Sequence, residues 1–258
     1  MVYLKNIEEI DKIRAGGLIL SNILGELVRR SGPGVATAEL DRLAERLMRE
    51  AGGEPSFKGY RTSGDVRPFP SSVCISLNDE VVHAPATPSR KLKEGDLLKL
   101  DIGIRYQGMC TDMAVTVGIG TISEEAQRLV EATRRSLGVG LEKTVAGNWI
   151  SDIGKAVDKF VRRNGFTTVK DMVGHGVGKY VHEDPRIPNY FDASLEPVRI
   201  APGMVLAIEP MVNAGADDVR MLDDAWTVVT ADHRLSAHFE VTVAVFKDKT
   251  EIMTPLPM

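Results

Sequence analysis

The chain has 258 residues, and 32 Lys and Arg against 36 Asp and Glu give it a formal net charge of −4. This length fits one large domain or two small ones and can bury a core without disulfides. A nearly balanced charge gives no electrostatic case for a nucleic-acid substrate, and no apolar run of about 18 residues predicts a membrane span. Two cysteines, Cys74 and Cys110, cannot form a disulfide framework, and no signal peptide is visible, so we expect a cytoplasmic protein.

Four segments have the apolar periodicity of amphipathic helices. Asn6 and Glu9 form a capping-box pattern before the first, and Ser123 stands where it can cap the third. Gly52 and Gly165 follow the second and fourth and are typical helix ends. The predicted helical segments are 10–27, 40–51, 123–141 and 150–160.

Six runs rich in β-branched residues and bounded by turn formers predict strands. Pro and Gly cluster at 52–70 and at 184–203, which predicts two long loops. Helices and strands in this proportion indicate an α+β fold. The predicted strands are 71–79, 96–106, 113–120, 204–212, 225–230 and 239–246.

A diluted internal repeat runs through the chain. Two helical segments are flanked by glycines at the same separation, and EGDLLKLDIG is matched later by PGMVLAIEPM. The alignment pairs Asp101 with Glu209 and Asp112 with Glu240. We therefore expect one catalytic domain over 1–258, built from halves at about 34–120 and 147–248 that are related by a pseudo-twofold axis.

Four acidic residues interrupt or border apolar strand patterns, namely Asp101, Asp112, Glu209 and Glu240. One such residue alone is more often a satisfied structural acid, but four that converge repel one another unless cations neutralise them. His175 lies in the Gly-rich segment GHGVG and is a credible fifth ligand. This donor set is too oxygen-rich for structural zinc and suits two bridged divalent ions, with Mn, Fe, Co and Zn all open.

The chain resembles the methionine aminopeptidases of type I, the bacterial and organelle form, over about residues 5–253. The resemblance implies a pita-bread fold, with two pseudo-twofold halves around a central antiparallel sheet. It also implies metal-dependent removal of the initiator methionine from nascent proteins and peptides with a small second residue. The resemblance rests on segments such as GHGVG and AIEPMVNAG and on the ordered set His83, Asp101, Asp112, His175, His182, Glu209 and Glu240.

The resemblance assigns roles to these residues. One ion would be bound by Asp112, His175, Glu209 and Glu240, and a second by Asp101 together with Asp112 and Glu240. Glu209 would also be the general base for water, His182 would stabilise the oxyanion, and His83 would contact the scissile nitrogen. The methionine pocket would consist of Tyr60, Phe69, Cys74 and Trp226, with Phe57 nearby.

The resemblance also implies a structural monovalent cation near Asn78, Glu80 and Ser236. A monomer is expected, with transient ribosome contact as a weaker expectation. Three departures stand out: a long stretch between Tyr60 and Cys74, Val181 where an aromatic residue is frequent, and His238 in place of the usual amide.

Two alternatives remain at this point. A proline-directed exopeptidase of the same fold, such as aminopeptidase P or prolidase, would carry a sizeable extra N-terminal domain, which we do not expect here. A non-catalytic peptide-binding module of this fold would be expected to have lost metal ligands, whereas all five are present in this sequence.

Overall fold

The computed structural model describes residues 2–62 and 64–257. Its four long helices lie where the periodicity predicts them. Asn6 and Glu9 form the predicted reciprocal capping box, and the Ser123 side chain accepts a hydrogen bond from the backbone N–H of Ala126. The helices are α1 Ile7–Arg30, α2 Thr37–Glu50, α3 Glu124–Lys143 and α4 Ile150–Arg163.

The central sheet follows the strand order β1-β4-β5-β14-β9-β7-β8, with β2 added beside β4 and β15 beside β14. Its pairings are antiparallel, and two smaller three-stranded sheets lie beside it. The strands are β1 Glu54–Pro55, β2 Val73–Leu77, β3 Glu80–Val82, β4 Leu97–Tyr106, β5 Met109–Gly118, β6 Thr167–Thr168, β7 Gly174–Gly176, β8 Glu183–Ile187, β9 Val205–Ile208, β10 Met211–Asn213, β11 Val219–Met221, β12 Val228–Thr230, β13 Ser236–His238, β14 Glu240–Val245 and β15 Thr250–Ile252.

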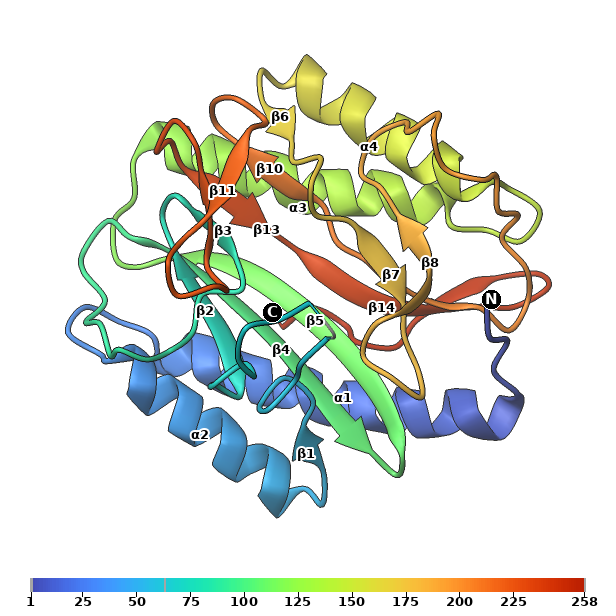
Figure 1. The fold of residues 1–258 in the computed structure, drawn as a ribbon, viewed down its shortest axis with the longest axis horizontal. Helices are drawn as coiled ribbons and strands as arrows, with labels where there is room; N and C mark the ends of the chain where they lie inside the picture. The colour runs from blue at the N-terminus through green and yellow to red at the C-terminus, as the bar shows by residue number, and fades with distance from the viewer. Residues whose placement is uncertain (1, 63, 258) are drawn as a thin grey trace.

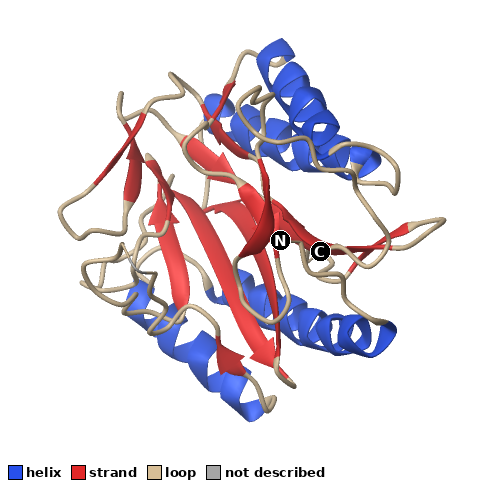
Figure 2. Cartoon of the chain, turned by 45° about the vertical axis from the view of Figure 1, so that its right-hand side comes forward, coloured by secondary structure: helices blue, strands red, loops and turns tan. Residues whose placement is uncertain are grey.

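The helices pack as two pairs on either side of the long strands. In Figure 1, α1 and α2 lie below the strands and α3 and α4 above them, and Figure 2 shows the same arrangement from another angle. α1 contacts β4 and β5, and α3 contacts β9, β10 and β13. Leu24, Ile102 and Ile153 belong to one continuous buried core, so the two halves share their apolar interior.

The same backbone contacts occur in both halves. The Gly34 N–H donates to the Leu92 carbonyl at 2.8 Å, and the Gly147 N–H donates to the Ile200 carbonyl at 2.9 Å. These matched contacts support the two-half arrangement, while the single catalytic domain over 1–258 stays a prediction. Matched glycines also share left-handed φ values: Gly34 88° and Gly147 94°, Gly52 79° and Gly165 82°, Gly95 89° and Gly203 90°.

Several predicted boundaries are wrong. β5 begins at Met109, so Asp112 lies inside a strand and not at its entrance. The run predicted at 204–212 is divided into β9 and β10, because Pro210 has no N–H to continue a ladder. The loop predicted at 184–203 begins with most of β8. No helix in the described part of the chain is both long and apolar enough to cross a membrane.

Candidate metal centre

Three acidic residues share one face of adjacent strands in the central sheet. Asp101 on β4 and Glu240 on β14 both pair with Ala114 of β5, from opposite sides. Asp112 lies two residues before Ala114, and alternate residues of a strand point to the same face. Strand register therefore brings the three carboxylates together, although 139 residues of sequence separate the first from the last.

Two further groups come from the neighbouring strands β9 and β7. Glu209 directly follows β9, and His175 on β7 pairs with Ala207 of β9. His175 Nε2 lies 3.3 Å from Glu209 Oε1. His175 Nδ1 lies 2.9 Å from the Gly176 carbonyl oxygen, which can only accept, so Nδ1 carries the proton and Nε2 keeps its lone pair. This tautomer is the one a metal ligand requires.

The acids are buried with too few partners. Asp112 and Glu240 are 2 % exposed and Asp101 and Glu209 are 8 % exposed. One carboxylate oxygen each of Asp101, Asp112 and Glu240 has no hydrogen-bond partner among the described residues. Buried ionised carboxylates need such partners or a cation. The donor set therefore fits hard divalent ions, which prefer oxygen ligands.

Three sets of three residues could each hold a metal ion, because within each set the candidate ligand atoms lie within 4.8 Å of one another. The sets share residues. His175, Glu209 and Glu240 form one group, and Asp101, Asp112 and Glu240 form a second. Asp112 also groups with His175 and His182. Together they contain the five predicted ligands, and the two acids predicted to bridge, Asp112 and Glu240, each occur in two groups.

Burial dominates the electrostatics of the acids. It raises the pKa of Asp101 to about 7 and that of Glu209 to about 7. Burial and the neighbouring carboxylates raise the pKa values of Asp112 and Glu240 well above their ordinary range. Burial therefore favours the protonated forms of these carboxyl groups, and a divalent ion that binds them displaces protons.

Both predicted accessory histidines line the same cavity. His182 Nδ1 lies 2.6 Å from the Tyr60 hydroxyl, and its ring lies edge-on to that of His175 at 4.5 Å between centroids. His83 directly follows β3 with a left-handed φ of 61°. Burial and the nearby His238 lower the pKa of His83 to about 4, so this ring is neutral at pH 7.

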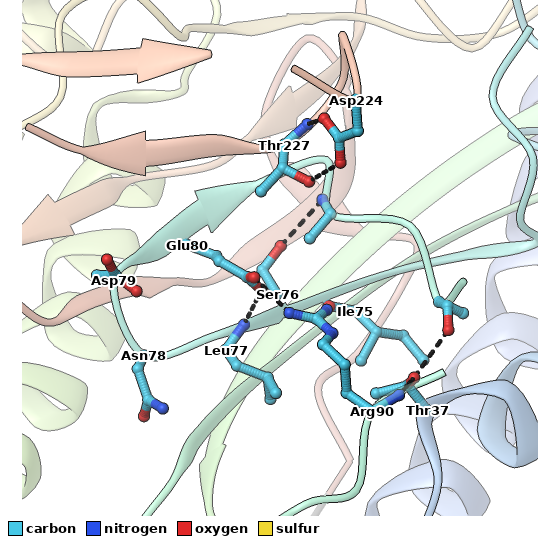
Figure 3. Close-up of polar contacts among 12 residues, drawn as sticks. Thr37, Ile75, Ser76, Leu77, Asn78, Asp79, Glu80, Arg90, Asp224 and Thr227 are labelled. Atoms are coloured by element: carbon cyan, nitrogen blue, oxygen red, sulfur yellow. Dashed lines mark hydrogen bonds and ion pairs between the residues drawn. The ribbon is translucent and has the colours of Figure 1, made fainter. Parts of the chain in front are cut away.

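The cavity has a volume of about 500 Å³, and all twelve predicted site residues line it. Its apolar part joins the two halves of the chain, because the rings of Phe69 and Trp226 meet edge-on at 5.2 Å. Asp224 accepts a hydrogen bond from the backbone N–H of Thr227 (Figure 3). It also accepts one from the backbone N–H of Trp226, and together these bonds hold the turn that carries the indole. Phe57, Tyr60 and Cys74 complete this part.

Some residues of the site carry no role in the sequence-based assignment. His238 is 1 % exposed, and its Nε2 lies 3.5 Å from Glu209 Oε2. Its position two residues before Glu240 was the available signal, since the residues flanking a ligand often position it. Met172 and Met211 also line the cavity, but an isolated methionine in sequence gives no indication of a pocket.

Residues 11–247 match metallopeptidase family M24, and the chain belongs to that family. The methionine aminopeptidase of Clostridium perfringens is 46% identical over 254 residues, which cover 98% of this chain and 99% of that protein. Methionine aminopeptidase 1 of Bacillus subtilis is 42% identical, with the same coverage of both chains. Within family M24 the chain therefore groups with the methionine aminopeptidases.

Solved structures agree with this grouping. The methionine aminopeptidase of Thermotoga maritima matches with a TM-score of 0.92 at 35% identity, covering 98% of this chain and 99% of that chain. An Xaa-Pro dipeptidase of Bacillus anthracis matches with a TM-score of 0.78 at 19% identity, covering 98% of this chain but 62% of that one. The second match shows a shared fold alone. The predicted α+β fold class is confirmed.

Proposed function

We propose that this chain hydrolyses the peptide bond after an N-terminal methionine, with divalent metal, in peptides and nascent chains that have a small second residue. The observation that carries the proposal is the set of buried carboxylates with unpartnered oxygens beside an apolar, sulfur-containing pocket. Relatives named methionine aminopeptidase that cover nearly the whole chain support the same reaction.

Five residues would hold two divalent ions: Asp112, His175, Glu209 and Glu240 at one position, and Asp101 with Asp112 and Glu240 at the other. Such ions act as Lewis acids and lower the pKa of a water molecule. Co, Mn, Fe and Zn all accept these ligands, because affinity and cellular supply together select the metal.

Glu209 is the general base in this proposal. Its carboxylate accepts the proton of the attacking water and returns it to the departing amine, which requires a carboxylate poised near neutral pH. His175 Nε2 and His238 Nε2 lie 3.3 and 3.5 Å from its two oxygens, so each oxygen faces an imidazole nitrogen.

The two accessory histidines orient the scissile amide. A Tyr60 O–H that donates to His182 Nδ1 leaves the proton on Nε2, which then donates to the developing oxyanion. His83 hydrogen-bonds the scissile nitrogen. Tyr60, Phe69, Cys74, Trp226 and Phe57 surround the methionine side chain, and a polarisable thioether packs well against sulfur and ring edges.

A peptide panel tests the proposal. Metal-loaded protein should release methionine from Met-Gly and Met-Ala peptides and spare Met-Lys peptides, and a chelator should abolish release. Release of Xaa from Xaa-Pro peptides would support the proline-directed alternative. Metal binding without hydrolysis in Mn, Fe, Co and Zn would support a binding module.

We further propose a monomer that acts in the cytoplasm and contacts the ribosome transiently through exposed basic residues. Such contact would place the site close to N-termini that emerge from ribosomes. Light scattering coupled to gel filtration would measure the mass, and co-sedimentation with ribosomes at rising salt would measure the contact. A stable dimer would contradict the monomer. Absence of salt-dependent co-sedimentation would contradict the ribosome contact.

A further inference from the structure

Lys99 is a lysine in the interior of the protein, with 1 % of its surface exposed. Its Nζ donates to the backbone carbonyls of Asn78 and Ser236, both at 2.9 Å. Carbonyl oxygens can only accept hydrogen bonds, so the amine is held as a donor between the turn after β2 and the start of β13. Burial lowers the pKa of Lys99 to about 7, while the carboxylates of Glu80 and Asp79 act in the opposite direction.

Lys99 lies among the residues expected to bind a monovalent cation, namely Asn78, Glu80 and Ser236. Its amine uses two of their carbonyl oxygens. The Glu80 carboxylate accepts from the Leu77 N–H at 2.6 Å and pairs with Arg90, as Figure 3 shows. Each of these oxygens already accepts a hydrogen bond or pairs with a cationic side chain. The oxygens therefore do not fit as ligands of an exchangeable ion.

The three segments joined by this amine lead into the metal centre. Lys99 precedes Asp101 by two residues on β4, so both side chains lie on one face. Asn78 begins the turn after β2, and β3 then ends one residue before His83. Ser236 begins β13, two residues before His238 and four before Glu240. One side chain therefore links strands that present a ligand, an accessory histidine and a second ligand.

We propose that Lys99 is a positioning residue whose amine replaces an exchangeable alkali cation and holds the strands that present Asp101, His83 and Glu240. The amine is part of the chain, so the arrangement of these strands does not depend on which cations the medium contains. The activity readout below rests on the proposed function, whereas the melting and crystallographic readouts do not.

The first test uses the wild-type protein. Activity on a Met-Ala peptide and Tm are measured with Mn²⁺ in choline chloride, and then with choline replaced by Na⁺, K⁺ or NH₄⁺ at constant ionic strength. We expect kcat, KM and Tm to be unchanged within error. Saturable activation or stabilisation by any of these cations would overturn the proposal.

The second test compares two substitutions. Lys99→Ala leaves the two carbonyls facing free space, so in choline we expect kcat to fall about tenfold and Tm by roughly 5 °C. K⁺, Na⁺ or NH₄⁺ should restore both with saturation. Lys99→Met fills the space with an apolar chain of similar length, and no cation should restore it. Wild-type behaviour of Lys99→Ala in choline, or a defect that no cation relieves, would reject the proposal.

Lys5 provides a matched control. It is 4 % exposed, but its Nζ pairs with the Glu183 carboxylate at 2.6 Å and not with two carbonyls. Lys5→Met should lower Tm without saturable recovery in K⁺ or NH₄⁺. Equal recovery of both lysine variants would indicate a general salt effect and would also reject the proposal.

Crystals soaked in thallium(I), an anomalous scatterer of about the size of K⁺, test the location. We expect no thallium peak between the Asn78 and Ser236 carbonyls in the wild type and a peak there in Lys99→Ala. A wild-type peak at this position would overturn the proposal even if Lys99→Ala fails to fold. A peptidase assay that fails entirely would leave this readout intact, which separates the two proposals.

Discussion

The two halves of the molecule contribute to the centre in different ways. β4 and β5 of the first half are ten-residue strands in one unbroken ladder, and Asp101 and Asp112 project from their interior. In the second half, β7 has three residues with a break in register, and Glu209 stands between β9 and β10. The contrast indicates that Asp101 and Asp112 come from long continuous strands, while His175 and the proposed general base Glu209 come from short or interrupted ones.

The largest effect is expected from the first half. Asp112→Asn removes a proposed bridging ligand, so activity should fall by at least about 10³-fold and bound metal should be lost. The metal-free variant should melt roughly 2–6 °C above the metal-free wild type, because one buried carboxyl group fewer has to be either protonated or desolvated. Metal analysis and Tm with a chelator measure both effects. A metal-free variant less stable than wild type would contradict the account of the buried acids.

Glu209→Gln tests the second half. The amide cannot take a proton from water, so kcat should fall by about 10²- to 10³-fold while the fold is retained. Glu251→Gln is the control, since Glu251 pairs with Arg14 outside the cavity. Steady-state kinetics and circular dichroism measure the outcome. An active Glu209→Gln protein would reject the general-base role and weaken the contrast between the halves.

The pocket joins the halves, so its loss should affect binding more than chemistry. Trp226→Leu removes the indole that packs on Phe69, and KM for Met-Ala peptides should rise about tenfold with a smaller change in kcat. Trp149→Leu is the control, because Trp149 stacks with Arg199 away from the cavity. Equal effects of both variants on KM would argue against the methionine pocket.

Metal-free protein should lose stability as pH rises from about 6.5 to 8. The folded state raises the pKa of Asp101 and Glu209 to about 7, so their stabilisation is complete below about pH 4, declines as pH rises, and loses its last part through this range. His83 and His238, with pKa values lowered to about 4, and His182, whose pKa burial also lowers, oppose the trend only below about 6.5. Lys99, whose pKa burial lowers to about 7, gains stability as pH rises, but this one group is outweighed by the four acids. Tm measured in chelator should fall between pH 6.5 and 8, and Tm measured with Mn²⁺ should not. A metal-free Tm that does not change with pH would contradict this expectation.

The smallest effects are expected at the helix caps, one in each of the two helix pairs. Asn6→Ala removes the cap of α1 and Ser123→Ala the cap of α3, and each should cost about 1 kcal/mol of unfolding free energy without loss of activity. Urea denaturation measures both. A much larger cost in one variant would show that the two helix pairs differ in stability.

The sequence alone predicts the parts of the fold that local chemistry determines. The four helices follow from apolar periodicity and from caps such as Asn6 and Ser123, and β4 follows from its branched residues. β7 and β8 were missed because GHG and EDPRI have no strand propensity, and their pairing depends on β9 and on each other. Tertiary pairing overrides local preference in both cases.

The sequence alone singles out the candidate ligands but not the strand pairing that brings them together. Charged residues inside apolar runs are conspicuous, which is why Asp101 and Glu240 stand out. The register through Ala114 that brings them together is invisible before the sheet forms. The Lys99 amine between two carbonyls is likewise a tertiary contact, and a lysine within a strand pattern gives no indication of its partners.

The position of Ala114 also sets the distance between two of the acidic residues. Asp101 and Glu240 flank it across two hydrogen-bonded ladders, and neighbouring strands lie about 4.8 Å apart whatever their side chains. The separation of the two carboxyl-bearing backbones is therefore a property of the peptide unit. The spacing of the strands is fixed, so the size of a metal centre on this sheet can change only through side-chain length. The choice between aspartate and glutamate at each position is therefore the available adjustment.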